Sequence, residues 1–117
     1  MKFGLMLPNK GNPFGDPNLL LELAMLAEEA GWEGFFLWDH IGGDHDFPAV
    51  DPWVCLGAIA SQTKSLYLGT MITPLSRRRP WKVAREIVTL DHLSGGRAVL
   101  GVGIGDLANK DFKAFGE

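Results

Sequence analysis

The chain has 117 residues, of which 46% are hydrophobic and 21% charged, as in one ordinary globular domain. Its 11 basic and 14 acidic residues give a formal charge of −3, and no apolar run approaches the roughly 20 residues that span a bilayer. We therefore expect neither nucleic acid nor a membrane as a partner. The single cysteine, Cys55, excludes a disulfide framework, and Met1 leads into no signal-peptide pattern, so we expect a cytoplasmic protein.

Short apolar runs alternate with amphipathic segments along the first half of the chain. Lys2–Leu7 predicts a strand that ends in a loop rich in proline and glycine. Asp16-Pro17 is typical of a helix start, and residues 18–30 place leucines and alanines on one face and glutamates on the other. Gly34–Trp38 is apolar without alternation, which predicts a strand covered on both faces.

The second half repeats this pattern. Asp51-Pro52 precedes a predicted helix from Trp53 to about Gln62, and Leu66–Ile72 predicts the third strand. A third helix is expected from Pro80 to Leu93 and a fourth strand over Arg97–Val102. Residues 107–117 are short and polar, and we expect no helix directly after the last strand.

Three strand–helix units followed by a strand indicate an α/β fold with parallel strands and right-handed crossovers. The units average about thirty residues, as in a βαβ module. A closed (β/α)₈ barrel needs about 250 residues, so the pattern predicts either half of such a barrel or an independent small open sheet.

Ligands of parallel α/β folds bind beyond the carboxyl ends of the strands, which meet at one edge of the sheet. Each predicted strand delivers candidate residues to that edge. In chain order these are Asn9 and Lys10, then Trp38, Asp39 and His40, then Thr73, and finally Gly103, Gly105 and Asp106.

His40 has two interpretations. Histidine exchanges protons near neutral pH and suits general acid–base chemistry or a hydrogen bond to a reduced cofactor. The alternative is a structural histidine whose ring bonds a loop carbonyl. A second histidine, His45, could form a metal site with Asp44 and Asp46, but a polar loop is the favoured interpretation and we expect no metal.

Other features also allow both a functional and a structural interpretation. Residues 101–105 carry three glycines with the wrong spacing for a dinucleotide fingerprint, and we expect them to let a flat ligand approach the backbone. Residues 77–79 are three arginines that could bind phosphate at a helix start, although a solvated charge run is favoured. Of the four tryptophans only Trp38 is placed to face a ligand, and the other three, Trp32, Trp53 and Trp81, are expected to pack at helix edges. Cys55 is interpreted as a small buried hydrophobe and His92 as a surface or packing residue.

Several motifs occur together in register along the chain. They are Trp38-Asp39-His40, Leu68-Gly69-Thr70 with Thr73-Pro74, the segments 91–97 and 100–105, and Lys110-Asp111-Phe112 with Phe115-Gly116-Glu117. In this combination the chain resembles the bacterial luciferase-like monooxygenase superfamily of flavin- or coenzyme F420-dependent oxidoreductases.

The resemblance implies a (β/α)₈ barrel of which residues 1–117 form a single, truncated half. It implies FMN or coenzyme F420 in the barrel mouth, with the choice undecided, and redox chemistry on a small organic substrate. His40 would be catalytic, and the cofactor would contact Asp39, Thr70, Met71, Ile72, Thr73, Gly103, Gly105 and Asp106. The segment Leu68–Pro74 matches the end of the third strand, where deazaflavin-dependent members have a bulge behind the ring.

The resemblance also implies a homodimer, which family members often form through their early helices. Separately, the count of four strands suggests the hypothesis that two copies complete a barrel, with the fourth strand of one beside the first strand of the other. One departure is Ile104, where some flavin-binding members have arginine. The alternative function is a non-catalytic barrel fragment that folds, associates or binds flavin weakly.

Overall fold

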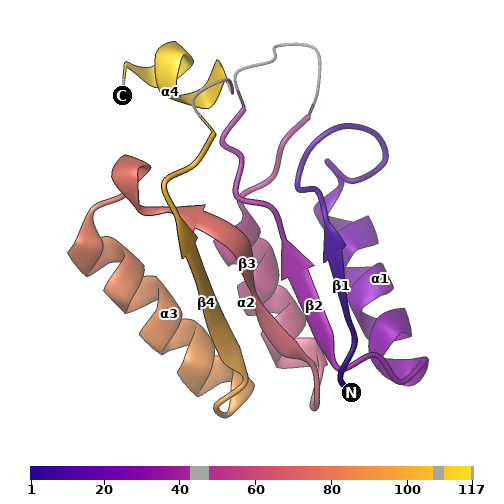
Figure 1. Cartoon of the computed structure of the whole chain (residues 1–117). Helices are drawn as coiled ribbons and strands as arrows, with labels where there is room; N and C mark the ends of the chain where they lie inside the picture. The colour runs from indigo at the N-terminus through magenta and orange to yellow at the C-terminus, as the bar shows by residue number, and fades with distance from the viewer. Residues whose placement is uncertain (43–47, 107–109, 117) are drawn as a thin grey trace.

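The computed structural model describes residues 1–42, 48–106 and 110–116. Its elements follow one another as strand and helix along the chain (Figure 1). The strands are β1 (Gly4–Leu7), β2 (Gly34–Leu37), β3 (Tyr67–Pro74) and β4 (Ala98–Gly103). The helices are α1 (Pro17–Glu29), α2 (Pro52–Gln62), α3 (Pro80–Ser94) and α4 (Lys110–Phe115), with a short 3₁₀ turn, η1 (Leu75–Arg77), after β3.

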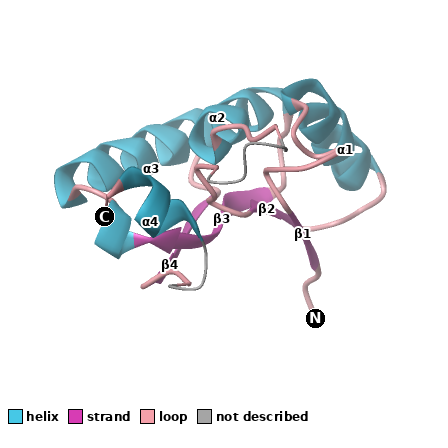
Figure 2. Cartoon of the chain, turned by 90° about the horizontal axis from the view of Figure 1, so that it is seen from above, coloured by secondary structure: helices cyan, strands magenta, loops and turns pink. Residues whose placement is uncertain are grey.

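The four strands form one sheet in the order β1-β2-β3-β4, and every neighbouring pair is parallel. This confirms the predicted α/β alternation. Helices α1, α2 and α3 lie on one side of the sheet (Figure 2). Because all strands run the same way, their carboxyl ends share one edge, and α4 lies beyond that edge (Figure 1).

The helix boundaries follow from the predicted caps. The Asp16 carboxylate accepts a hydrogen bond from the Asn18 amide at 2.9 Å, and Asp51 accepts from the Val54 amide at 3.0 Å. Both helices have proline in the first turn, where no amide donor is needed. Gly95, with φ of 68°, ends α3 in the left-handed conformation that glycine adopts without strain.

The core lies between the sheet and the three helices. Helix residues Leu20, Leu56 and Ile59 and strand residues Phe35 and Leu68 have no exposed surface. Cys55 belongs to this core, and its burial, together with the nearby Asp51 charge, raises the pKa of its thiol. The interpretation of Cys55 as a buried hydrophobe is confirmed.

The opposite face of the sheet keeps apolar side chains in contact with solvent. Successive strand residues point to opposite faces. The sequence neighbours of Met6, Tyr67 and Val99 pack into the core, so these three residues lie on the other face of the sheet. Their side chains are 51%, 40% and 39% exposed. In the described part of the chain, no helix is long and apolar enough to cross a membrane.

Three expectations need correction. β3 continues to Pro74, two residues beyond its predicted end, because its pairing with β4 resumes at Thr73 after an irregularity. A helix, α4, forms in the segment after β4 for which none was expected. Trp81 was expected to pack against the fold but is 69% exposed, whereas Trp53 is buried as expected.

Candidate active site

A cavity of about 470 Å³ opens at the carboxyl ends of β2, β3 and β4. Its walls come from the ends of these strands, from η1 and from α4, so it lies where a parallel α/β fold is expected to bind ligands. The lining residues are Trp38, Asp39, His40, Met71, Ile72, Pro74, Arg77, Val102, Gly103, Ile104, Gly105, Asp106, Asp111 and Phe112.

One wall is formed by a bulge in β3. The register with β4 shifts between Thr70 and Thr73, and the Met71–Ile72 peptide bond between them is cis. Thr70 and Thr73 are buried and their hydroxyls bond one another. Met71 and Ile72 are therefore the residues of the bulge that face the cavity, and their side chains are 50% and 37% exposed.

Two glycines at the end of β4, Gly103 and Gly105, lie next to side chains that line the cavity. A Cβ atom on Gly103 would lie 2.8 Å from Cδ1 of Ile72. A Cβ atom on Gly105 would lie 2.8 Å from the Phe112 ring, and the φ of 85° at Gly105 disfavours other residues. Side chains at these positions would collide with Ile72 of the bulge and Phe112 of α4, both of which line the cavity.

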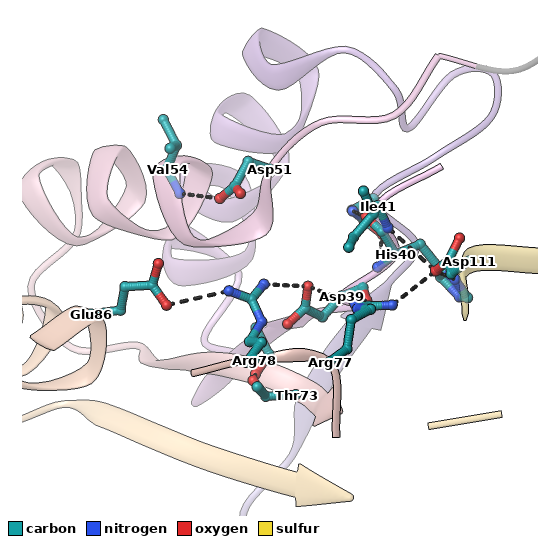
Figure 3. A network of polar contacts seen from close by, with 12 residues as sticks. Asp39, His40, Ile41, Asp51, Val54, Thr73, Arg77, Arg78, Glu86 and Asp111 are labelled. Atoms are coloured by element: carbon teal, nitrogen blue, oxygen red, sulfur yellow. Dashed lines mark hydrogen bonds and ion pairs between the residues drawn. The ribbon is translucent and has the colours of Figure 1, made fainter. Parts of the chain in front are cut away.

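A buried ionic cluster, drawn in Figure 3, forms part of the cavity wall. The Arg77 guanidinium donates to Asp111 Oδ2 at 3.0 Å, to Asp39 Oδ1 at 3.3 Å and to the Asp39 carbonyl. The Arg77 side chain is 3% exposed and both aspartate side chains are 1% exposed. Buried charges are stable in a low-dielectric site only when each has a partner of opposite charge. Through its two ion pairs, Arg77 links η1 to the segment after β2 and to α4.

Arg78 extends the cluster toward α3. Its guanidinium donates to Asp39 Oδ1 at 2.7 Å and to Glu86 Oε2 at 3.3 Å, and it lies 5.9 Å from the Trp53 ring centre. The prediction of a solvated charge run is therefore wrong for Arg77 and Arg78, because distant carboxylates take up both guanidinium groups. It is right for Arg79, which is exposed and lies beside Trp81.

His40 is held at the cavity by its backbone and its ring. Asn9, which is fully buried, accepts from the His40 amide at 3.1 Å and donates to the His40 and Val50 carbonyls, each at 2.7 Å. The His40 Nδ1 atom lies 3.1 Å from Asp111 Oδ2, and the Trp38 ring meets the imidazole edge-on at 5.4 Å. Asn9 thus serves as a brace for His40 and does not line the cavity.

The structure brings most predicted site residues together. His40, Asp39, Met71, Ile72, Gly103, Gly105 and Asp106 line the cavity, whereas Thr70 and Thr73 are buried behind it. Trp38 also lines it, as expected, but Lys10 does not; its backbone pairs with Ala49.

Sequence reasoning considered Arg77 only as one of three arginines that could bind phosphate, and it missed two further site residues, Asp111 and Phe112. The only signal for the last two was their place in the motif Lys110-Asp111-Phe112. The candidate metal loop 44–46 lies outside the described residues, and His92 is exposed. Within residues 1–42, 48–106 and 110–116, no group of three or more metal-ligating side chains could hold an ion.

Comparison with known proteins identifies the family. The sequence model of the luciferase-like monooxygenases matches residues 1–117. The chain belongs to this family. An F420-dependent glucose-6-phosphate dehydrogenase of Microbacterium testaceum is 40% identical over 100 residues, which cover 80% of this chain and 29% of that protein.

Solved structures show the same architecture. The coenzyme F420-dependent tetrahydromethanopterin reductase of Methanopyrus kandleri superposes with a TM-score of 0.82 and 32% identity, covering 98% of this chain and 30% of that one. An FMN-bound type II Baeyer–Villiger monooxygenase from Pseudomonas putida, at 23% identity and a TM-score of 0.82, covers 99% and 33% and shows the fold alone. The predicted barrel-type fold is confirmed, and the chain spans about 30% of the length of the proteins it matches.

Proposed function

We propose that this chain forms the mouth of an oxidoreductase active site that binds coenzyme F420 and moves hydride between it and a small organic substrate. The observation that carries the proposal is one cavity in which His40 stands together with the apolar bulge of β3. A proton-exchanging side chain beside a flat apolar surface is what hydride transfer to or from a carbon–oxygen bond requires, because the oxygen must gain or lose a proton.

The residues of the cavity fit a planar ring system. Met71 and Ile72 offer an apolar surface, and Gly103, which lacks a Cβ atom, makes room for the Ile72 side chain and presents its backbone to the cavity. A ring held there would lie against backbone and branched side chains, which exclude water from one of its faces. When bound, the deazaflavin would supply hydride transfer, whereas FMN would also support oxygen activation.

Different roles follow for the site residues. We assign Met71, Ile72, Gly103 and Gly105 to contact with the ring, and His40 to proton exchange. Thr70 and Thr73 would shape the pocket from behind, since they are buried and their hydroxyls bond one another. Asp39 lines the cavity and is engaged with arginine partners, so it would shape the wall. Asp106 is exposed at the rim and would meet a polar part of the ligand.

The names of the relatives favour F420 over FMN. Both the Microbacterium dehydrogenase and the Methanopyrus reductase are described as F420-dependent. The FMN enzyme is more distant, and its likeness concerns the fold. The β3 bulge points the same way, since the sequence resemblance associates it with deazaflavin-dependent members.

Titration of the purified chain with F420 and, separately, with FMN tests this function through the fluorescence of each ligand. We expect saturable micromolar binding of F420 and weaker binding of FMN. Gly103→Val should weaken F420 binding at least about tenfold, since its side chain would displace Ile72 from the wall of the cavity. Gly57→Val is the matched control, because a Cβ at Gly57 meets nothing within 4 Å. A folded chain that binds neither ligand would overturn the proposal.

The role of His40 is tested by substitution. His40→Ala should lower hydride transfer by about 10²–10⁴-fold, the usual contribution of a positioned acid or base, while the Kd of F420 stays nearly constant. Unchanged turnover would remove His40 from the chemistry. Tight binding without turnover in the wild-type chain would instead favour the alternative, a non-catalytic module that binds the cofactor.

A homodimer is a further part of the proposal. β1 and β4 are the edges of the sheet, and open strand edges next to exposed apolar side chains favour pairing. Two copies could then place β4 of one beside β1 of the other. Sedimentation at micromolar concentration should show a dimer, and a monomer would contradict this pairing. The cytoplasmic location suggested by the single cysteine stays a prediction.

A further inference from the structure

Asp111 is the one residue that α4 buries, although this helix has only six residues. Its Oδ2 atom accepts from the Arg77 guanidinium at 3.0 Å and from the Ile41 amide at 3.3 Å. The same oxygen lies 3.1 Å from Nδ1 of His40, which is 71 residues away in the chain. Three groups that converge on one oxygen show that α4 is docked on the site through this carboxylate (Figure 3).

The direction of the contact with His40 follows from charge. A carboxylate paired with a guanidinium is an acceptor and has no proton to give, so Nδ1 must donate. A neutral imidazole that carries its proton on Nδ1 has its lone pair on Nε2. A histidine held in this way exchanges protons through Nε2, as in triads where a buried carboxylate fixes the histidine tautomer.

We propose that Asp111 is a positioning residue that fixes His40 in the Nδ1–H form and so makes Nε2 the nitrogen that exchanges protons with a ligand in the cavity. The proton exchange rests on the proposed function, but the tautomer does not. The surrounding contacts support a fixed ring, because Asn9 clamps the His40 backbone on both its amide and its carbonyl. Trp38 also meets the ring edge-on.

The tautomer can be measured by NMR on the chain labelled with ¹⁵N in its three histidines. At about pH 9, above the range in which histidine titrates, the two ring nitrogens give distinct shifts that report which of them carries the proton. His40→Gln assigns the signals. We expect wild-type His40 to be mainly in the Nδ1–H form. A wild-type ring that is mainly in the Nε2–H form would overturn the proposal directly.

Substitution of the carboxylate tests its cause. Asp111→Ala removes the acceptor and should change the tautomer ratio of His40 at least about tenfold in favour of Nε2–H, since a hydrogen bond to a charged group is lost. An unchanged ratio would overturn the proposal. If Asp111→Ala does not fold, Asp111→Asn replaces it. Its amide has nearly the same volume but no charge, so the Nδ1–H fraction should fall, and a constant fraction would count against the proposal.

A matched control and a second reading separate this inference from the proposed function. Asp16→Asn removes a carboxylate at the start of α1, where asparagine caps equally well, and should leave the His40 ratio unchanged. Titration of the same samples with F420 reports cofactor binding independently. If the His40 tautomer depends on Asp111 but the chain binds no F420, the positioning role is supported and the proposed function is rejected. If the chain binds F420 but the tautomer does not depend on Asp111, the function is supported and the positioning role is rejected.

Discussion

Two arginines at opposite ends of the sheet bind the fold together in different ways. Arg97, just before β4, donates to the carbonyls of Ser94, Leu66, Ala60 and Thr63 at 2.6–3.1 Å and to the Thr63 hydroxyl at 3.1 Å. Its partners are neutral and lie around the amino ends of β3 and β4. Arg77, at the carboxyl end, has charged carboxylates as its side-chain partners.

The two arginines also differ in whether the buried polar atoms around them all have hydrogen-bond partners. The Nε atom of Arg97 donates to Ser94, whereas the buried Nε atom of Arg77 and Oδ2 atom of Asp39 have no hydrogen-bond partner among the described residues. Buried polar atoms without partners destabilise a fold and are rare outside functional sites. The amino end of the sheet is thus built for stability, whereas the carboxyl end concentrates charge next to the cavity, as in barrel enzymes generally.

The largest effect is expected from Arg77→Met. It leaves Asp39 and Asp111 buried without a shared cation and should lower the free energy of unfolding by about 3–5 kcal/mol. Urea denaturation at neutral pH measures the loss. Arg79→Met is the control within the same run of arginines, because Arg79 is exposed, and its effect should stay within about 0.5 kcal/mol. Similar small losses for both variants would show that the carboxylates do not depend on Arg77.

Arg97→Met should come second, with a loss of about 3 kcal/mol from hydrogen bonds that each contribute roughly 0.5–1.5 kcal/mol. Urea denaturation again gives the value, and Arg85→Met on the exposed surface of α3 is the control. Because Arg97 lies at the end of the sheet opposite His40, we expect the tautomer of His40 in folded Arg97→Met to match that of the wild type. A changed tautomer would mean that the two ends of the sheet are coupled.

The fold was largely predictable because its signals are local. The caps Asp16-Pro17 and Asp51-Pro52 and the stop at Gly95 act over a few residues, and the apolar periodicity of α1 and α3 extends over three or more turns. α4 escaped prediction because six residues are too few to show a helical period. Its position depends on the contact between Asp111 and Arg77, which lie 34 residues apart.

The site was predictable only in part, for the same reason. His40 and Asp39 could be named because a strand end defines their place. Arg77 and Arg78 looked like solvated charges because a run of three arginines has no acidic neighbours in sequence. Their carboxylate partners come from the segment after β2, from α3 and from α4, and no local pattern contains that information.

The smallest effect concerns Glu28, a charged group at the stable end of the sheet. Partial burial acts to raise the pKa of its carboxyl, but hydrogen bonds from Ser65, Lys64 and Leu66 outweigh it and hold the pKa below its usual value of 4.5. The carboxylate accepts from the Ser65 amide at 2.6 Å and from its hydroxyl at 2.8 Å, and so ties α1 to the loop before β3.

A lowered pKa in the folded state stabilises the fold above the unfolded pKa, and this contribution is lost as the pH falls through the folded value. Glu28→Gln should therefore lower the free energy of unfolding by about 1 kcal/mol at pH 7. The difference in unfolding free energy between the variant and the wild type should become smaller below the usual carboxyl pKa of 4.5. Urea denaturation at a series of pH values measures this difference, with the exposed Glu22→Gln as control. A difference that stays constant down to acid pH would show that the Glu28 charge does not stabilise this end of the sheet, and that its ties, like those of Arg97, act through neutral hydrogen bonds.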